Sequence, residues 1–182
     1  MTQSKIEDAF KKVVSELNPN WESDPDMRET PHRLGRFYMH FFRNEDPNAH
    51  MGKRFPTKNR NFVIVKNIEC FGMCPHHLTP VIYKINIGYL PEKWALGLSK
   101  LARVAVACAS SPKLQENLTS DIVDCVYKQL KPNGVIATVE GVHGCMRCRG
   151  VEQDTSAVTV DYRGKKMNDL KIKNEFYTLL KI

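Results

Sequence analysis

The chain has 182 residues, 42% of them hydrophobic and 26% charged, which predicts one globular domain whose core needs no disulfide bonds. No apolar run reaches the roughly 18 residues that span a bilayer, and the amphipathic start lacks a signal-peptide core, so we expect a cytoplasmic protein without a membrane partner. The net charge of +7 suits a nucleic acid or a phosphorylated small molecule equally, but without a run of five basic residues we expect no direct nucleic-acid binding.

Two helices are predicted at the start of the chain. Apolar residues recur at helical spacing over residues 4–17. A second helix is predicted from the segment TPHRLGRFYMHFF, with Thr30 as its N-cap and Pro31 in its first turn. Residues 44–60 are polar and rich in turn residues, so they are predicted to be a loop. We therefore expect residues 1–60 to form an N-terminal helical segment and loop.

The rest of the chain carries strand patterns on either side of helix patterns. The segment VIYKINIGYL alternates, with Tyr83, Ile85, Ile87 and Tyr89 on one face, which is typical of a half-buried strand. The predicted elements are strands over 61–70, 81–90, 135–142 and 157–162, a helix capped by Ser99, and helices over 114–130 and 168–182. This order predicts an α+β fold with an antiparallel sheet, and residues 61–182 are expected to form one domain.

Cysteine and histidine gather in two clusters about 70 residues apart. The first cluster holds Cys70, Cys74, His76 and His77, and the second holds His143, Cys145 and Cys148. A catalytic zinc takes three such ligands and keeps a fourth position for water, whereas a structural zinc is closed by four ligands. Neither cluster repeats the C-x-x-C spacing of a zinc ribbon, which favours the open site. Adjacent histidines on an extended chain point opposite ways, so we expect one to bind metal and the other to face a substrate.

The remaining cysteines and three polar motifs suggest further roles. Cys108 and Cys125 fall on apolar helix faces and are expected to be buried as small hydrophobic residues. The motif GLSKLAR places three side chains in the first turn of a helix, where an anion is favoured: Ser99, Lys100 and Arg103. The alternative for these residues is an ordinary solvated basic face. Glu116 could cap its helix or accept two N–H donors from a guanine edge, and Arg149 could place a guanidinium beside the metal.

In order and spacing, these motifs resemble the GTP cyclohydrolase I family. The resemblance is carried by ETPHR at 29–33, CPHH at 74–77, GLSKLAR at 97–103, LQE at 114–116, HGCMRCRG at 143–150 and TSAVT at 155–159. It implies a tunnelling fold, in which an antiparallel sheet with a helix pair on one face is completed to a barrel by oligomerisation. It also implies a homodecamer of two stacked pentamers, with active sites between subunits.

The same resemblance implies zinc-dependent hydrolysis of GTP to 7,8-dihydroneopterin triphosphate and formate, a product that feeds folate, biopterin and 7-deazapurine synthesis. It implies zinc ligands Cys74, His77 and Cys145, and proton transfers by His76 and His143. It implies triphosphate binding by Ser99, Lys100, Arg103, Arg149 and, from a neighbouring subunit, Arg33. It implies guanine recognition by Glu116, supported by Gln115 and by backbone near Leu96 and Leu98. The alternatives are a same-fold relative acting on another purine or pterin, and a zinc-stabilised oligomeric scaffold without activity.

Three residues depart from the pattern of that family. Pro75 stands where the family usually has Glu, which removes a carboxylate beside the zinc and fixes the backbone angle. Cys148 is an extra thiol near the site, and Asn117 replaces the more usual Arg after Glu116. None of the three removes a residue to which the resemblance gives a direct role.

Overall fold

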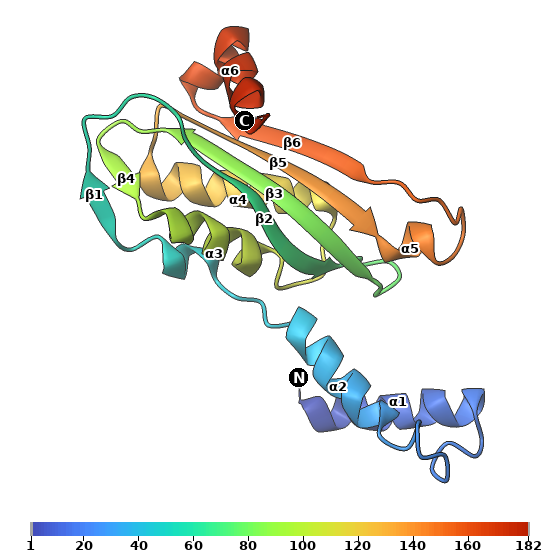
Figure 1. Ribbon diagram of the computed structural model, residues 1–182. Coiled ribbons are helices and arrows are strands. Elements are labelled where there is room, and N and C mark those ends of the chain that lie inside the picture. The colour runs from blue at the N-terminus through green and yellow to red at the C-terminus, as the bar shows by residue number, and fades with distance from the viewer. Residues whose placement is uncertain (1, 182) are drawn as a thin grey trace. The chain divides into compact units, whose positions relative to one another are not determined.

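The computed structural model describes residues 2–181, which divide into two compact units, one ending at Arg43 and the other beginning at Asn44. Figure 1 shows the elements along the chain. They are α1 (Gln3–Leu17), α2 (Thr30–Phe41), η1 (Pro47–His50), β1 (Arg54–Pro56), β2 (Val63–Met73), β3 (Pro80–Leu90), β4 (Trp94–Leu96), α3 (Leu98–Cys108), α4 (Gln115–Leu130), β5 (Gly134–His143), α5 (Gly144–Arg147), β6 (Ala157–Arg163), η2 (Lys165–Asn168) and α6 (Leu170–Leu180).

The first unit is a pair of helices held by aromatic contacts. The ring of Phe10 on α1 stacks on that of Tyr38 on α2, with centroids 5.1 Å apart. Both helices were predicted, but Glu29 rather than Thr30 occupies the N-cap of α2. The cap shifts by one residue because proline is tolerated at either of the first helical positions, so Pro31 does not fix the start.

The second unit is built on an antiparallel sheet in the order β2-β3-β5-β6, which confirms the predicted α+β class. The alternation in β3 is also confirmed, since the side chains of Tyr83, Ile85, Ile87 and Tyr89 are all buried. Helices α3 and α4 cover this face of the sheet (Figure 1). Their apolar residues, such as Leu101 on α3, complete the main hydrophobic core.

The opposite face of the sheet is covered only in part. Phe176 of α6 packs with Ile136 and Met167 in a second, smaller core. Gly88 of β3 makes room for this helix, because a Cβ there would lie 2.8 Å from the Phe176 ring. Farther along the same face, apolar side chains remain exposed: Phe71, Ile82, Val158 and Val160.

Two local predictions were wrong. The segment 44–60 was predicted to be a loop, but it contains η1 and the short strand β1, which pairs with β4. Strands of three residues are too short for an alternating pattern to reveal them. Ser99 was predicted to cap α3, whereas the N-cap is Gly97 and no side chain caps this helix.

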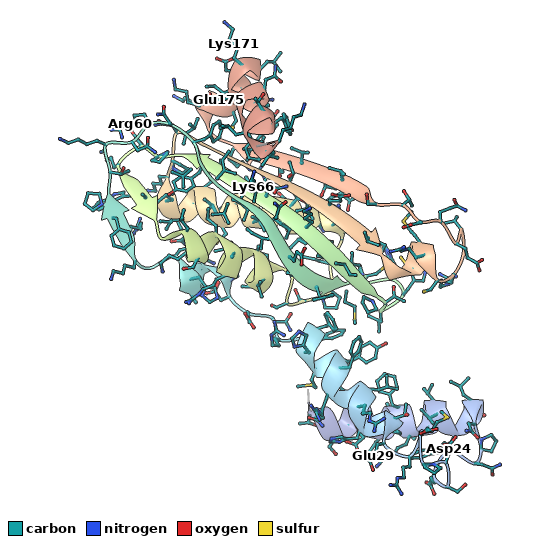
Figure 2. All side chains as sticks on the ribbon, in the orientation of Figure 1. Asp24, Glu29, Arg60, Lys66, Lys171 and Glu175 are labelled. Atoms are coloured by element: carbon teal, nitrogen blue, oxygen red, sulfur yellow. The ribbon has the colours of Figure 1, made fainter. Side chains whose placement is uncertain are left out.

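Charged side chains lie on the surface, as the mixed composition requires. Arg60, Lys66 and Lys171, labelled in Figure 2, are exposed. Among residues 2–181, no helix combines the length and the apolar character needed to cross a membrane.

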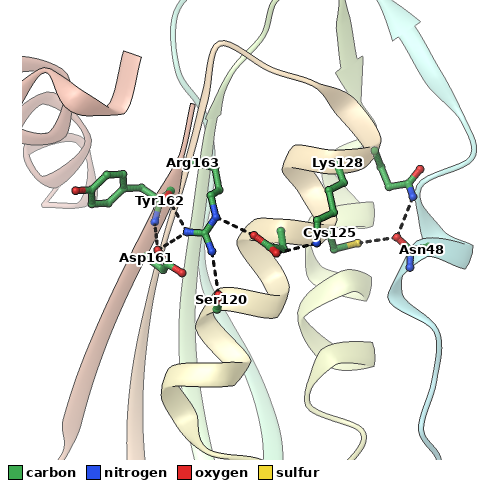
Figure 3. A network of polar contacts seen from close by, with 9 residues as sticks. Asn48, Ser120, Cys125, Lys128, Asp161, Tyr162 and Arg163 are labelled. Atoms are coloured by element: carbon green, nitrogen blue, oxygen red, sulfur yellow. Dashed lines mark hydrogen bonds and ion pairs between the residues drawn. The ribbon is translucent and has the colours of Figure 1, made fainter. Parts of the chain in front are cut away.

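An ionic network ties α4 to the edge strand β6 (Figure 3). The Arg163 guanidinium lies 2.8 Å from the Asp124 carboxylate and donates to Asp161 at 2.6 Å. It also donates to the Ser120 hydroxyl at 3.0 Å. The hydrogen bond from Lys128, with the nearby Arg163, holds the pKa of Asp124 below its usual value. Burial raises the pKa of Asp161, but its hydrogen bonds, led by that from Arg163, outweigh this and lower the pKa.

We expect Arg163→Gln to weaken the pH dependence of stability. Carboxylates with lowered folded-state pKa values stabilise the fold above their unfolded pKa of about 4, and this contribution is lost as the pH falls through the folded values. Thermal unfolding should therefore show a drop in melting temperature below about pH 4 that is smaller in Arg163→Gln than in wild type. The exposed control Arg60→Gln should keep the wild-type profile. A variant profile parallel to wild type would contradict the role of Arg163.

Candidate metal centre and active-site pocket

The loop of residues 74–79 between β2 and β3 holds Cys74, His76 and His77 of the first cysteine–histidine cluster, whereas Cys70 lies within β2. Two hydrogen bonds close this loop: the Cys74 N–H donates to the Thr79 carbonyl, and the Leu78 N–H donates to the Cys74 carbonyl, both at 3.0 Å. Pro75 suits the start of the turn because its ring fixes φ near −65°. Leu78 adopts φ 50°, which costs a non-glycine residue about 1 kcal/mol. The chain here is thus a turn rather than the extended segment that we expected.

The second cluster reaches this loop through the register of β3 with β5. Val81, at the start of β3, pairs with His143, at the end of β5. The short helix α5 then begins at Gly144 and turns Cys145 toward the loop. Gly144 permits the close approach, because a Cβ there would lie only 2.9 Å from the Pro80 carbonyl oxygen.

Three side chains from the two clusters form a candidate metal centre. The ligand atoms of Cys74, His77 and Cys145 all lie within 4.8 Å of one another. The Cys74 Sγ and His77 Nδ1 are 3.7 Å apart. Two ligands of a tetrahedral zinc lie about 3.5 Å apart when the Zn–S bond is about 2.3 Å and the Zn–N bond about 2.0 Å. The donor set and its spacing therefore fit a zinc ion and leave a fourth position open.

The cysteines differ in their electrostatic surroundings. Burial and the adjacent Cys74 thiol raise the pKa of Cys145, while the Thr79 hydroxyl opposes this rise. A bound cation would reverse the balance because it stabilises thiolates. The other buried cysteines are inert: burial raises the pKa of Cys70 to about 11, that of Cys108 to about 12 and that of Cys125 to about 11.

His143 is held beside the metal centre by the side chain of Gln115. The His143 Nε2 lies 2.8 Å from the Gln115 Oε1. The Gln115 amide nitrogen donates to the carbonyls of Val139 and Ala157, both at 2.9 Å, so its oxygen is the end that faces the imidazole. His143 therefore carries a proton on Nε2, and Nδ1 is the atom that can gain or lose one. Burial lowers the pKa of His143, and the Glu116 carboxylate raises it.

Tyr83 forms a packed support beneath these residues that sequence reasoning did not assign to the site. Its ring meets that of His143 edge-on, with centroids 6.3 Å apart. The ring lies against Gly72 and Gly141, where any added Cβ would clash with it, and a Cβ at Gly141 would also displace the Gln115 side chain. The sequence signal was available in the two strand glycines, which often mark a close approach of another group.

A cavity of about 270 Å³ opens beside the metal centre. It gathers most of the candidate site residues: Cys74, His76, His77, Gln115, Glu116, His143 and Cys145. Pro75 also lines it and presents an apolar ring where the resembling family usually has a carboxylate. Gln115, only 4% exposed, has both ends of its amide bonded to protein groups. Its support of a bound guanine stays a prediction.

The candidate triphosphate residues of α3 lie elsewhere in the chain. Helix α3 starts just after β4, toward the Leu90 end of β3, whereas the metal centre lies at the Pro80 end (Figure 1). Ser99 and Arg103 are exposed, and the Lys100 ammonium donates to the His50 carbonyl at 2.8 Å. One chain therefore does not bring these residues to the cavity.

Three other candidate residues are also outside the cavity lining. Arg149 is exposed in the segment after α5, and Leu98 is exposed at the start of α3. Arg33 lies on α2 in the first unit. Asn117, which follows Glu116, is exposed.

The second unit is an antiparallel α+β domain with an open Cys-His-Cys centre, and the adjoining cavity is lined by two further histidines and a carboxylate. These are the features of a metal-dependent hydrolytic enzyme. The profile of GTP cyclohydrolase I matches residues 6–181. The chain belongs to the GTP cyclohydrolase I family.

Individual relatives agree with this assignment. The chain is 40% identical to GTP cyclohydrolase 1 of Finegoldia magna over 99% of both chains. It is 43% identical to GTP cyclohydrolase 1 of Desulforamulus reducens over 88% of this chain and 87% of the relative. It is 35% identical to GTP cyclohydrolase 1 of Clostridium kluyveri over the full length of both.

We expect Cys145→Ala to lose bound zinc, because it removes one of the three candidate ligands found among residues 2–181. Cys148→Ala is the matched control, since Cys148 is exposed three residues away and its thiol donates to the Gly144 carbonyl at 2.8 Å. Zinc per chain, measured by atomic absorption after gel filtration, should fall for Cys145→Ala alone. Equal zinc content in the two variants would refute Cys145 as a ligand.

Proposed function

We propose that the protein hydrolyses GTP, with net consumption of one water molecule, to 7,8-dihydroneopterin triphosphate and formate. The observation that carries the proposal is the convergence of Cys74, His77 and Cys145 next to His143 and Glu116 in one cavity. Such a site combines a metal centre, a proton-transfer group and a carboxylate for base recognition. Family membership supports the same reaction, because the matched relatives carry the name GTP cyclohydrolase 1.

In the proposal, Cys74, His77 and Cys145 hold a zinc ion. Zinc supplies Lewis acidity and lowers the pKa of a water in its open position to about 7. Cys74 and Cys145 are among the six free cysteines of the structure. Because cysteine binds zinc as a thiolate, both must stay reduced. This requirement supports the prediction that the protein works in the reducing cytoplasm.

His143 transfers protons through Nδ1 in this proposal. Gln115 accepts the Nε2 proton, which fixes the tautomer and leaves Nδ1 to exchange protons, while burial lowers the pKa of the ring. His143 then protonates N7 of guanine, which makes C8 electrophilic and prepares the imidazole ring for opening. His76, which lines the same cavity, takes part in later proton transfers as C8 is released as formate.

Glu116 recognises the guanine. It is an exposed residue in the first turn of α4 and lines the cavity, so its carboxylate can meet a bound ligand. A guanine edge offers two neighbouring N–H donors that one carboxylate can accept together.

The separation of the metal centre from α3 supports a site shared between subunits. If Ser99, Lys100, Arg103, Arg149 and Arg33 bind the triphosphate, at least those on α3 must come from another copy of the chain. The open edges of β2 and β6, and the exposed apolar sheet face, are consistent with barrel closure in a decamer of two pentamers. The mass of the protein in solution tests this assembly.

The direct test is to incubate the zinc-loaded protein with GTP and to measure formate and, after oxidation, pterin fluorescence. Both products should appear in equal amounts. A folded, zinc-containing protein that releases neither would overturn the proposal and leave the alternatives of another purine or pterin substrate, or of a scaffold.

We expect His143→Ala to keep its zinc but to lower turnover by about 100- to 10,000-fold, the usual contribution of a general acid–base group. His143 is not among the three metal ligands, so zinc content and turnover should separate. Zinc analysis and the formate assay on the same sample check both. Loss of zinc together with activity would contradict the assigned role.

We expect Glu116→Ala to weaken GTP binding by about ten- to a hundredfold, because a charged hydrogen-bond acceptor is lost. Inosine triphosphate lacks the exocyclic amine, so its binding should fall less, and the preference for GTP should shrink. The matched control is Asn117→Ala at the adjacent exposed position. Competition binding measures the affinity of wild type and of each variant for GTP and for inosine triphosphate. An unchanged preference of Glu116→Ala for GTP would count against the guanine contact.

A further inference from the structure

Thr79 ends the loop that carries Cys74 and His77, and the roles above leave its hydroxyl unused. The Thr79 Oγ1 is shielded from solvent and, within residues 2–181, makes no hydrogen bond of ordinary geometry. Buried hydroxyls are seldom left without a partner, because water is lost and nothing replaces it. The groups around this oxygen therefore indicate its role.

The hydroxyl lies at the junction of the two halves of the metal centre. The hydrogen bond from the Cys74 N–H to the Thr79 carbonyl, at 3.0 Å, holds Thr79 across the loop from one ligand. A Cβ at Gly144 would lie 3.5 Å from the Thr79 Cβ and 3.8 Å from its Oγ1, so the side chain faces the backbone immediately before Cys145.

Two residues of this hairpin cannot donate from the backbone. Pro75 follows Cys74, and Pro80 follows Thr79, and neither proline has a backbone N–H to offer a sulfur atom. A threonine hydroxyl can donate one hydrogen bond, and its β-branched side chain has few rotamers, so it can be aimed at little entropic cost. Thiolate ligands of metals are commonly stabilised by such donors.

We propose that Thr79 is a positioning residue for the metal centre, whose hydroxyl donates a hydrogen bond to the Cys145 thiolate when zinc is bound. The bond fixes the direction of the sulfur lone pairs toward the metal. It also withdraws charge from the sulfur, which leaves the zinc a stronger Lewis acid. This inference rests on the metal centre of the proposed function.

The test compares zinc affinity in Thr79→Val, which removes the donor at constant shape, with Thr79→Ser, which keeps it. Competition with a chromogenic chelator at fixed pH should show affinity about tenfold weaker for Thr79→Val, the usual cost of removing a partner of a ligand. Thr79→Ser should stay close to wild type. Thr155→Val, an exposed threonine on the segment before β6, is the matched control and should also match wild type.

Cobalt substitution supplies a readout that a purely structural role would not move. Loss of a donor to the thiolate should shift the sulfur-to-cobalt charge-transfer band to lower energy in Thr79→Val, and Thr79→Ser should restore it. If Thr79→Val does not fold, Thr79→Ala takes its place.

The outcomes distinguish a failure of the role of Thr79 from a failure of the metal centre. Equal zinc affinity and an unshifted band in Thr79→Val would overturn the role of Thr79 and leave the metal centre standing. Failure of the wild-type chain to bind zinc or cobalt would overturn the metal centre itself, and the role of Thr79 with it.

Discussion

The pairing of β3 with β5 is the constraint on which the site depends. Val81 faces His143 in this register, and that places the loop of residues 74–79 against the start of α5. Because side chains alternate along a strand, a slip by one residue would turn His143 to the other face of the sheet and carry Cys145 away from Cys74. The register is held by the buried alternation of β3, since the same slip would expose its whole apolar face.

Close packing then fixes the positions of the side chains around the site. Tyr83 can lie beneath His143 only because Gly72 and Gly141 on the neighbouring strands have no side chains. The same absence at Gly141 leaves space for Gln115, whose amide links α4 to the backbone of β5 and β6 before it reaches the imidazole. The first turn of α4 is thereby fixed to the sheet, and Glu116 and His143 line one cavity.

Sequence reasoning was sound where the signal is local. The period-two pattern of β3 and the apolar faces of α3 and α4 predicted the class of fold, because burial on one side leaves a periodic trace. It was wrong for β1 and η1 in the segment 44–60, which are too short for periodicity, and for the cap of α3. It also expected an extended chain at His76 and His77, where two hydrogen bonds and the positive φ of Leu78 form a turn. Thr79 and the contact of Gln115 with His143 gave no signal that spacing could detect.

By itself, the sequence determined the types of metal-binding side chain, the order of helices and strands, and the motifs of the family, because these depend on residue identity and local periodicity. Only the tertiary structure decided which donors meet: Cys145 joins Cys74 and His77, while Cys148 stays exposed. It also decided that the basic residues of α3 lie toward the far end of the sheet from the metal centre. The physical reason is that these distances follow from strand register and from the packing of residues far apart along the chain, neither of which leaves a local pattern.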